Sequence, residues 1–338
     1  MINRLLMIAS LVLLTGSAQA NDSLRVLLSF GINTGLPDEV QLRYAENDAR
    51  AFADLMNDTG EVKVADSTVL TGAQSKDLTQ AIAAIAQRVE TFKKSGGKDV
   101  VLFFYFSGHG DAENLHIGKE RYAMKTLEQQ LATIPARLRI AVIDACRGKS
   151  DVSAKGFTRT KAFSVNLDAP KGISGVVTLK SSSEGEQSQE SGNLKGAVFT
   201  HYLLTALRGA GDRDRDQQVT LDEAYTYAYR QTVLRSAASP GNVMHPSVEL
   251  DIEGAGELVL TRTVQRTARV QLPQARDTRY LLFSRLSGSV EAEVWSDPER
   301  AIGLAVSPGK YLLQRRGAGG SGALEFTVDD GQTYAVNM

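Results

Sequence analysis

Residues 101 to 110 read VLFFYFSGHG, and residues 140 to 148 read IAVIDACRG. Each stretch begins as an unbroken apolar run, which is typical of a strand buried on both faces, and then changes to small and polar residues. The first contains His109 near its end, and the second contains Cys146. Two buried strands therefore each end in a side chain that can take part in acid–base or nucleophilic chemistry.

Segments with strand and helix patterns alternate on both sides of these two stretches. Apolar runs predict strands at 24–32, 62–70, 174–182, 246–252 and 257–261, and helical spacing predicts helices at 38–56, 78–92, 123–134, 197–208 and 221–235, with a hairpin at 114–118. This alternation predicts an α/β fold with a mostly parallel sheet and helices on both faces. Ligands bind such sheets beyond the carboxyl ends of the strands, where His109 and Cys146 lie.

The pattern changes after about Thr263. Short alternating runs such as RYLLFS (279–284) and VEAEVW (290–295) are separated by turn sequences such as SPG and GAGGSG. This pattern is typical of a small antiparallel, sandwich-like β domain. We expect an α/β domain at 21–262 and a β domain at 263–338.

Composition and the amino terminus limit the environment of the chain. The net charge of −1 and the pI near 6.5 give no field that favours nucleic acid or anionic lipid. Residues 1–20 combine Arg4, an apolar stretch too short to span a bilayer, and small residues up to Ala20. They predict a signal peptide, export to the periplasm or the medium, and no stable membrane insertion after its removal. The only cysteine of the chain cannot form an internal disulfide.

A cysteine and a histidine at neighbouring strand ends can form a nucleophilic pair. Cysteine attacks as the thiolate, and an imidazole that accepts its proton makes it a competent nucleophile. The amides of Gly110 and Cys146 could then bind the developing oxyanion. The alternative is a structural histidine and an inert buried cysteine in unrelated strands.

The sequences FYFSGHG and VIDACRG resemble, in this order, the His and Cys motifs of the caspase and metacaspase superfamily. The resemblance extends over about 24–262. It implies a caspase-like fold, with His109 as the catalytic base and Cys146 as the nucleophile. Animal caspases have Gln two residues before the cysteine, whereas this chain has Asp144, which brings it closer to metacaspases that cleave after Arg or Lys.

Strand alternation supports the same specificity independently. Asp144 should project beside Cys146, and Ser107 beside His109, because side chains two apart share a face. The resemblance to metacaspases adds Asp48 to this acidic pocket, although Asp48 could instead only cap its helix. The expected partner is a protein or peptide with Arg or Lys at the cleavage site. The basic segment from Lys149 to Lys171, with Lys155 and Arg159 at its middle, is an expected site of self-cleavage.

The segment DRDRDQQVTLDE (212–223) has the residue types of a calcium-binding EF-hand loop, with helical patterns on both sides. Its candidate ligands are Asp212, Asp214, Asp216, Gln218, Thr220 and Glu223. Gln217 stands where the turn usually needs glycine, and a solvated acidic loop is the alternative. The chemistry itself requires no cofactor, and Ca²⁺ is an optional one. His116, His201 and His245 lack metal-ligand spacing and are expected to be structural.

These features predict an exported, caspase-like cysteine endopeptidase that cuts after Arg or Lys. One alternative is a catalytically silent caspase-like module for calcium-dependent binding or envelope adhesion. Another is a hydrolase of the same fold that acts on a non-peptide acyl substrate.

Overall fold

The computed structural model describes residues 23–145, 173–183, 186, 188–238, 243–265, 268–317 and 320–338. Three features of the sequence lie outside these residues: the expected signal peptide, Cys146, and the basic segment from Lys149 to Lys171. Among the helices in the described part of the chain, none is both long and apolar enough to cross a membrane.

A sheet of eight strands forms the centre of the described structure. Its main path has the order β11-β7-β6-β3-β1-β2, and β4 and β5 extend it from the end of β3. Neighbouring strands from β7 to β2 are parallel, and β11 pairs antiparallel with β7. The strands are β1 (Ser23–Gly31), β2 (Ser67–Thr71), β3 (Asp99–Gly110), β4 (Asn114–Ile117), β5 (Glu120–Ala123), β6 (Leu138–Ala145), β7 (Ser174–Lys180) and β11 (Ser247–Glu253).

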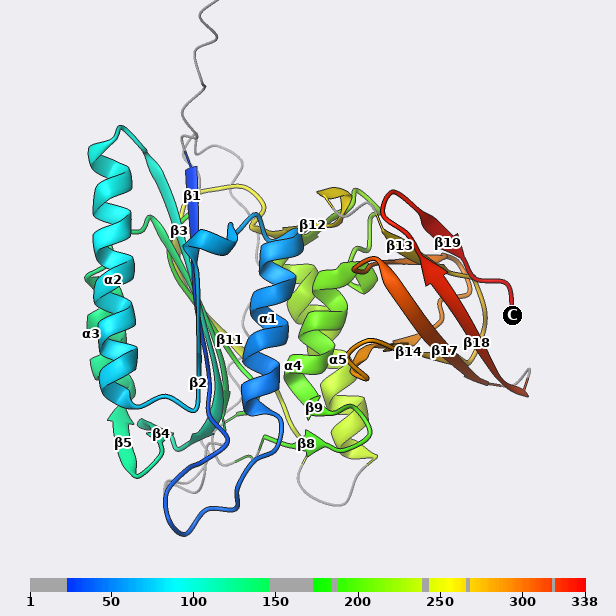
Figure 1. Cartoon of the computed structure of the whole chain (residues 1–338), viewed down its shortest axis with the longest axis horizontal. Helices are drawn as coiled ribbons and strands as arrows, with labels where there is room; N and C mark the ends of the chain where they lie inside the picture. Colours follow the sequence, from blue (N-terminus) through cyan, green and yellow to red (C-terminus); the bar gives the residue numbers. More distant parts are fainter. Residues whose placement is uncertain are drawn as a thin grey trace, which may run out of the picture.

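Helices cover both faces of this sheet (Figure 1). One face packs against α1 (Ala45–Thr59), α4 (Val198–Thr205) and α5 (Leu221–Ala237), and the other against α2 (Ser75–Lys94) and α3 (Met124–Ala132). Strand β3 alternates between the two cores: Phe103 and Tyr105 belong to the first, and Phe104 and Phe106 to the second. This two-sided burial explains why its sequence is an unbroken apolar run.

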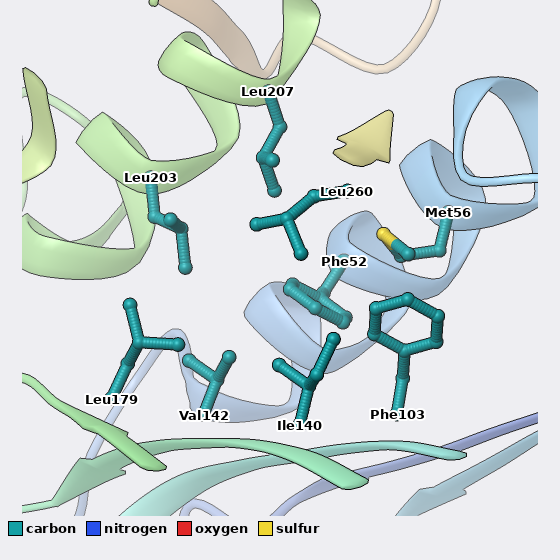
Figure 2. Close-up of a pocket in the computed structure, with 9 residues that line it drawn as sticks. All are labelled: Phe52, Met56, Phe103, Ile140, Val142, Leu179, Leu203, Leu207 and Leu260. Atoms are coloured by element: carbon teal, nitrogen blue, oxygen red, sulfur yellow. The ribbon is translucent and has the colours of Figure 1, made fainter. Parts of the chain in front are cut away.

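The core between the sheet, α1 and α4 is closely packed (Figure 2). Nine apolar side chains surround a space of about 10 Å³, and no polar atom lines it. That volume is at the lower limit for one water molecule, so this space is packed core and not a ligand site. The nine residues are Phe52, Met56, Phe103, Ile140, Val142, Leu179, Leu203, Leu207 and Leu260.

The first helix begins later than its sequence pattern predicts. The pattern suggests a start near residue 38, but α1 begins at Ala45. The intervening residues form a loop in which Leu42 N–H donates to Asn33 O over 2.8 Å and Glu39 N–H donates to Leu36 O over 2.9 Å. The bond from Leu42 to Asn33, nine residues apart, and the turn closed by Glu39 therefore replace helical hydrogen bonds. This loop lies at the carboxyl ends of the strands (Figure 1).

The carboxy-terminal part of the described chain is all β. A three-stranded sheet of order β16-β13-β19 and a four-stranded sheet of order β15-β14-β17-β18 share one apolar core. Most of their pairings are antiparallel, whereas β13 and β19 are parallel. The strands are β13 (Arg269–Leu272), β14 (Thr278–Ser284), β15 (Val290–Trp295), β16 (Ile302–Ala305), β17 (Gly309–Gly317), β18 (Gly320–Val328) and β19 (Thr333–Ala335).

This β unit, here meaning strands β13 to β19, packs against α4 and the turn that follows it. Tyr202 O–H donates to Glu293 over 2.7 Å in a buried contact, and Arg279 pairs with the same carboxylate at 2.8 Å. Arg208 and Glu291 form a second ion pair at 2.6 Å. Two of these contacts, Tyr202–Glu293 and Arg208–Glu291, join the β unit to the α/β part, whereas Arg279–Glu293 lies within the β unit and holds the Glu293 carboxylate in place.

Short elements complete the described structure. They are η1 (Val64–Asp66), β8 (Glu190–Ser191), β9 (Gly196–Ala197), η2 (Ala206–Ala210), β10 (Gln218–Thr220), β12 (Val259–Arg262) and η3 (Thr263–Gln265). The predicted fold class, an α/β sheet with helices on both faces followed by a β-rich region, is confirmed.

Candidate active site

The carboxyl ends of β3 and β6 lie side by side at the end of the sheet where β4, β5, β8 and β9 gather (Figure 1). The parallel register sets Ser107 opposite Asp144 and Gly108 opposite Ala145. The residues two and four positions before Ser107 and Asp144 belong to the core beneath α1 and α4. Strand alternation therefore turns Ser107, Asp144 and His109 toward the same face.

The His109 imidazole has a defined orientation. Its Nε2 atom lies 2.7 Å from the carbonyl oxygen of Val40, and only 11% of the side chain is exposed. A carbonyl oxygen can only accept, so Nε2 carries hydrogen and the lone pair of the neutral ring is on Nδ1. Nδ1 is therefore the atom that can take a proton from a nucleophile.

The Gly110 amide points away from β4. Asp111 N–H donates to Asn114 O over 2.8 Å, and Gly110 stands opposite Leu115 in the next pair of the ladder. Hydrogen-bonded and non-hydrogen-bonded pairs alternate along an antiparallel ladder, so Gly110 N–H is not used by β4. It faces the β6 side of the strand.

Asp144 is buried and receives three hydrogen bonds from neutral donors. Ser188 O–H donates to Oδ1 over 2.5 Å. Thr200, in the first turn of α4, donates its amide over 3.2 Å and its hydroxyl over 2.7 Å to Oδ2. The Thr200 hydroxyl hydrogen is used in this bond to Asp144. The Tyr105 O–H is therefore the donor in its 2.7 Å contact with the Thr200 hydroxyl oxygen.

Asp48, from the first turn of α1, is also buried but receives less support. Its Oδ2 accepts one backbone hydrogen bond, from Ala197 N–H in β9, over 2.9 Å. A Cβ atom on Gly196 would lie 2.8 Å from Oδ1, so only glycine lets the β9 backbone pass this close. The neighbouring Glu190 accepts the Arg43 and Tyr44 amides, at 2.9 and 2.8 Å, at the start of α1.

Asp48, Asp144 and Glu190 are called the acidic cluster from here on. In this cluster, burial and mutual repulsion disfavour the negative charge of Asp48. Burial raises the pKa of Asp48 well above its ordinary value, and the nearby charges of Asp144 and Glu190 raise it further, against the lowering effect of the Ala197 amide. Burial, together with the charges of Asp48 and Asp144, also raises the pKa of the Tyr105 hydroxyl. A cation placed here would be stabilised by these charges.

A model of the caspase domain matches residues 25–238 of this chain. The chain belongs to the caspase-domain family. It is 24% identical over 202 residues to a probable protease from a Desulfuromonadales bacterium, and the alignment covers 53% of this chain and 24% of that protein. The match thus spans about a quarter of the length of this curated relative.

Among solved structures, caspase-1 from Spodoptera frugiperda is similar, with a TM-score of 0.46 and 14% identity, over 68% of this chain and 86% of that one. A structure of pro-sf-caspase-1 has a TM-score of 0.45 and 12% identity, with the same coverage of both chains.

Within this caspase domain, the structure brings together the predicted residues Asp48, Ser107 and Asp144 at the end of the sheet that also carries His109 and Gly110. Cys146 comes directly after Ala145 in the sequence and lies outside the described residues.

Sequence reasoning missed the residues that support this cluster. Thr200 and Ser188 hold Asp144 from 56 and 44 residues away, and Glu190 contacts the start of α1 from 146 residues away. Threonine and serine carry no spacing signal of their own. Thr200 lies within the range of the resemblance, 24–262, but the resemblance gave this residue no role.

The other histidines have different surroundings. His201 is buried in α4, and its Nε2 has no hydrogen-bond partner among the residues that the structure describes. Burial and the charges of Arg208 and Arg235 lower the pKa of His201 to about 3, so it is neutral. His245 Nδ1 pairs with Glu186 at 2.6 Å. His116 lies beside His109, opposite it in the β3–β4 ladder.

In the acidic loop at 212–223, three of the six candidate calcium ligands converge, and the other three make hydrogen bonds within the loop and at the start of α5. Asp212, Asp214 and Asp216 each offer an oxygen within 4.8 Å of the others. The Glu223 carboxylate instead accepts Arg213 N–H over 2.8 Å and closes a capping box with Thr220 at the start of α5. The remaining candidate, Gln218, donates its side-chain amide to Asp216 over 2.6 Å.

Proposed function

We propose that this caspase-domain chain is a cysteine endopeptidase that cleaves after Arg or Lys, with Cys146 as the nucleophile and His109 as the base. The observation that carries the proposal is the acidic cluster at the sheet end that carries His109. Among the described residues, Asp48 and Asp144 form no ion pair with Lys or Arg, although both are buried. Buried carboxylates that lack a cation are costly, and such sites commonly serve function.

The proposed reaction uses two groups at this end of the sheet, the Nδ1 atom of His109 and the N–H of Gly110. His109 Nδ1 takes the thiol proton, the thiolate attacks the substrate carbonyl carbon, and Gly110 N–H donates to the resulting oxyanion. The protonated Nδ1 then gives its proton to the leaving amine as the carbon–nitrogen bond breaks. Water, deprotonated by the same imidazole, hydrolyses the acyl-enzyme and restores the thiol.

Specificity follows from the charge of the cluster. The side chain of Arg or Lys before the scissile bond would bring the missing cation to Asp48 and Asp144. A charge-assisted hydrogen bond contributes about 1.5–3 kcal/mol, which corresponds to a factor of about 10–100 in kcat/KM.

The test compares fluorogenic peptides that differ only in arginine or citrulline before the scissile bond. Citrulline has nearly the same shape but no charge. We expect the arginine peptide to be cleaved faster by at least the factor above, and the Cys146→Ala variant to cleave neither. Equal turnover of both peptides, or a preference for aspartate, would contradict the specificity, and no turnover of any peptide would contradict the peptidase.

We propose that the three aspartates Asp212, Asp214 and Asp216 can hold Ca²⁺, which would stabilise the loop before α5 and take no part in bond cleavage. Their oxygens converge, and carboxylates are the ligands that Ca²⁺ prefers. Burial raises the pKa of Asp212, as do the charges of Glu223 and Asp216, so a cation would relieve repulsion there. Calorimetry on the wild type and Asp214→Asn should show heat of binding only for the wild type.

We also propose that residues 1–20 direct export and that the basic segment from Lys149 to Lys171 is cut by the peptidase itself. Its support is the sequence pattern together with the Arg/Lys preference proposed above. Mass spectrometry of the exported protein should give an amino terminus at Asn21 and cuts after Lys155 or Arg159, which the Cys146→Ala variant should lack. An intact segment in fully active enzyme would contradict self-processing.

A further inference from the structure

The loop between β1 and α1 supplies the oxygen that orients His109. Its Val40 side chain is 83% exposed, so apolar packing does not fix the position of the Val40 carbonyl. The loop is tied instead to the hairpin of β4 and β5, where Gly118 N–H donates to Thr34 O over 3.2 Å. The contact between Val40 O and His109 Nε2 therefore depends on polar contacts made elsewhere in this loop.

Glu39 makes the central contact of the loop, because its carboxylate joins three groups. Oε2 accepts Leu36 N–H over 2.7 Å, and Oε1 lies 2.7 Å from Nδ1 of His116. The same Oε1 lies 3.9 Å from Nδ1 of His109. One carboxylate thus closes the turn that precedes Val40, fastens it to β4, and faces the nitrogen that takes up the proton.

His116 is held in turn by a second carboxylate. Its side chain is buried, and its Nε2 lies 3.0 Å from Oδ2 of Asp111. Both ring nitrogens therefore face carboxylate oxygens, an arrangement in which a protonated imidazolium donates twice. Burial acts to raise the pKa of Asp111, but hydrogen bonds from His116, Glu113 and Asn114 outweigh it and lower that pKa to about 2. Asp111 is therefore an anion, and Arg121 pairs with it at 2.7 Å.

Gly35 shows how closely the loop encloses the catalytic ring. A Cβ atom at this position would lie 2.6 Å from Cδ2 of His109 and 2.1 Å from Oε2 of Glu39. The loop backbone therefore contacts the imidazole on one side while Glu39 and Val40 fix it on others.

We propose that Glu39 and His116 are positioning residues that hold the His109 ring in its Nε2–H tautomer, with Nδ1 free to act as the base. This inference rests on the proposed peptidase function. Glu39 keeps the Val40 carbonyl on Nε2, and His116 keeps the Glu39 carboxylate in place. The role is that of an orienting third group in a nucleophile–base pair, supplied here by two side chains in series.

The first test is kinetic and uses Glu39→Gln. A neutral amide cannot accept from both Leu36 N–H and His116, so the turn loosens while its shape is conserved. Loss of an outer orienting partner typically costs about 10–100-fold, and we expect this loss in kcat with KM changed less than about threefold. His116→Asn should give a similar loss, and the double variant should be no worse than either single one.

Glu120→Gln is the matched control. Glu120 lies in β5 of the same hairpin, but its carboxylate bonds Ser75 and contacts neither histidine. This variant should keep wild-type kcat and KM. An unchanged kcat in Glu39→Gln, or equal losses in Glu39→Gln and Glu120→Gln, would overturn the proposal.

The second test does not depend on turnover. In folded Cys146→Ala protein labelled with ¹⁵N-histidine, NMR should show His109 as the Nε2–H tautomer. Adding Glu39→Gln should give a tautomer mixture at His109, whereas Glu120→Gln should not. An unaltered His109 tautomer would refute the positioning role even if peptidase activity is never found, and an inactive wild type with the expected spectra would refute only the peptidase.

Discussion

Replacing Asp48 by asparagine should make the protein more stable and less able to cleave after arginine. Asp48 is buried, near the charges of Asp144 and Glu190, and has a single backbone donor, Ala197 N–H. Asparagine keeps an oxygen acceptor for that amide and removes the charge. The substitution therefore separates the function of the carboxylate from its structural role.

The magnitude can be worked from these contacts. An uncompensated buried charge costs about 3–5 kcal/mol, and a hydrogen bond to a charged group returns about 1.5–3 kcal/mol. The difference predicts that Asp48→Asn raises the free energy of unfolding by about 2 kcal/mol at mildly alkaline pH. For the arginine peptide, loss of the charged contact should lower kcat/KM by about 10–100-fold, while citrulline turnover should change little.

The pH dependence has a defined sign. Burial, with the like charges of Asp144 and Glu190, raises the pKa of Asp48 in the folded state. The stabilisation from the proton on Asp48 is present at low pH and is lost as pH rises through the folded-state pKa. Urea unfolding at several pH values should therefore give the variant a higher free energy of unfolding than the wild type at alkaline pH. At acidic pH the two free energies should be equal.

Two results would refute this reasoning. If Asp48→Asn is less stable than the wild type at alkaline pH, the carboxylate is a structural group that its environment supports. If the variant keeps the full preference for arginine over citrulline, Asp48 does not contact the substrate charge. Circular dichroism of the folded variant excludes a trivial loss of structure in either case.

Other substitutions test the contacts that support the site and the β unit. Glu293→Gln leaves Arg279 without its buried partner and should cost about 3–5 kcal/mol in urea unfolding; a change under 1 kcal/mol would show that the contact is not buried in solution. Thr200→Val removes one donor from Asp144, so it should lower the free energy of unfolding by about 1–3 kcal/mol and slow turnover of the arginine peptide. Unchanged kinetics would show that Thr200 does not support the site. Thr220→Ala removes the α5 cap and should cost about 1 kcal/mol in thermal unfolding, with or without Ca²⁺; no loss in either condition would contradict the capping role.

The sheet and one row of the site could be predicted from the sequence, for physical reasons. Strands buried on both faces must be apolar throughout, so β3 and β6 are visible as unbroken runs. Alternation then fixes which side chains share a face, and it puts Ser107 and Asp144 on the side that the register confirms. These inferences need only local geometry.

The rest depends on long-range contacts that local pattern does not contain. The residues from 38 to 44 have helical spacing, yet they form the loop that holds His109, because hydrogen bonds to Asn33 and His116 replace those of a helical turn. Strand β16 escaped prediction because four residues with a central glycine, Gly303, give too short a pattern. The pairing of His109 with His116 required the antiparallel ladder, which spacing alone does not reveal.

The two buried aspartates differ in how their charge is compensated, and this difference gives them separate roles. Asp144 receives three hydrogen bonds, from Ser188 and Thr200, whereas Asp48 receives one. Asparagine at 144 would set its amide hydrogens against one of these donors, so Asp144→Asn should lower the free energy of unfolding by about 1–3 kcal/mol, opposite in sign to Asp48→Asn. Side-by-side urea unfolding of the two variants measures this contrast, and stabilisation by both would show that Asp144 too is an uncompensated charge. With the expected result, Asp144 is the fixed anion of the site, and Asp48 is the carboxylate whose charge the substrate cation stabilises.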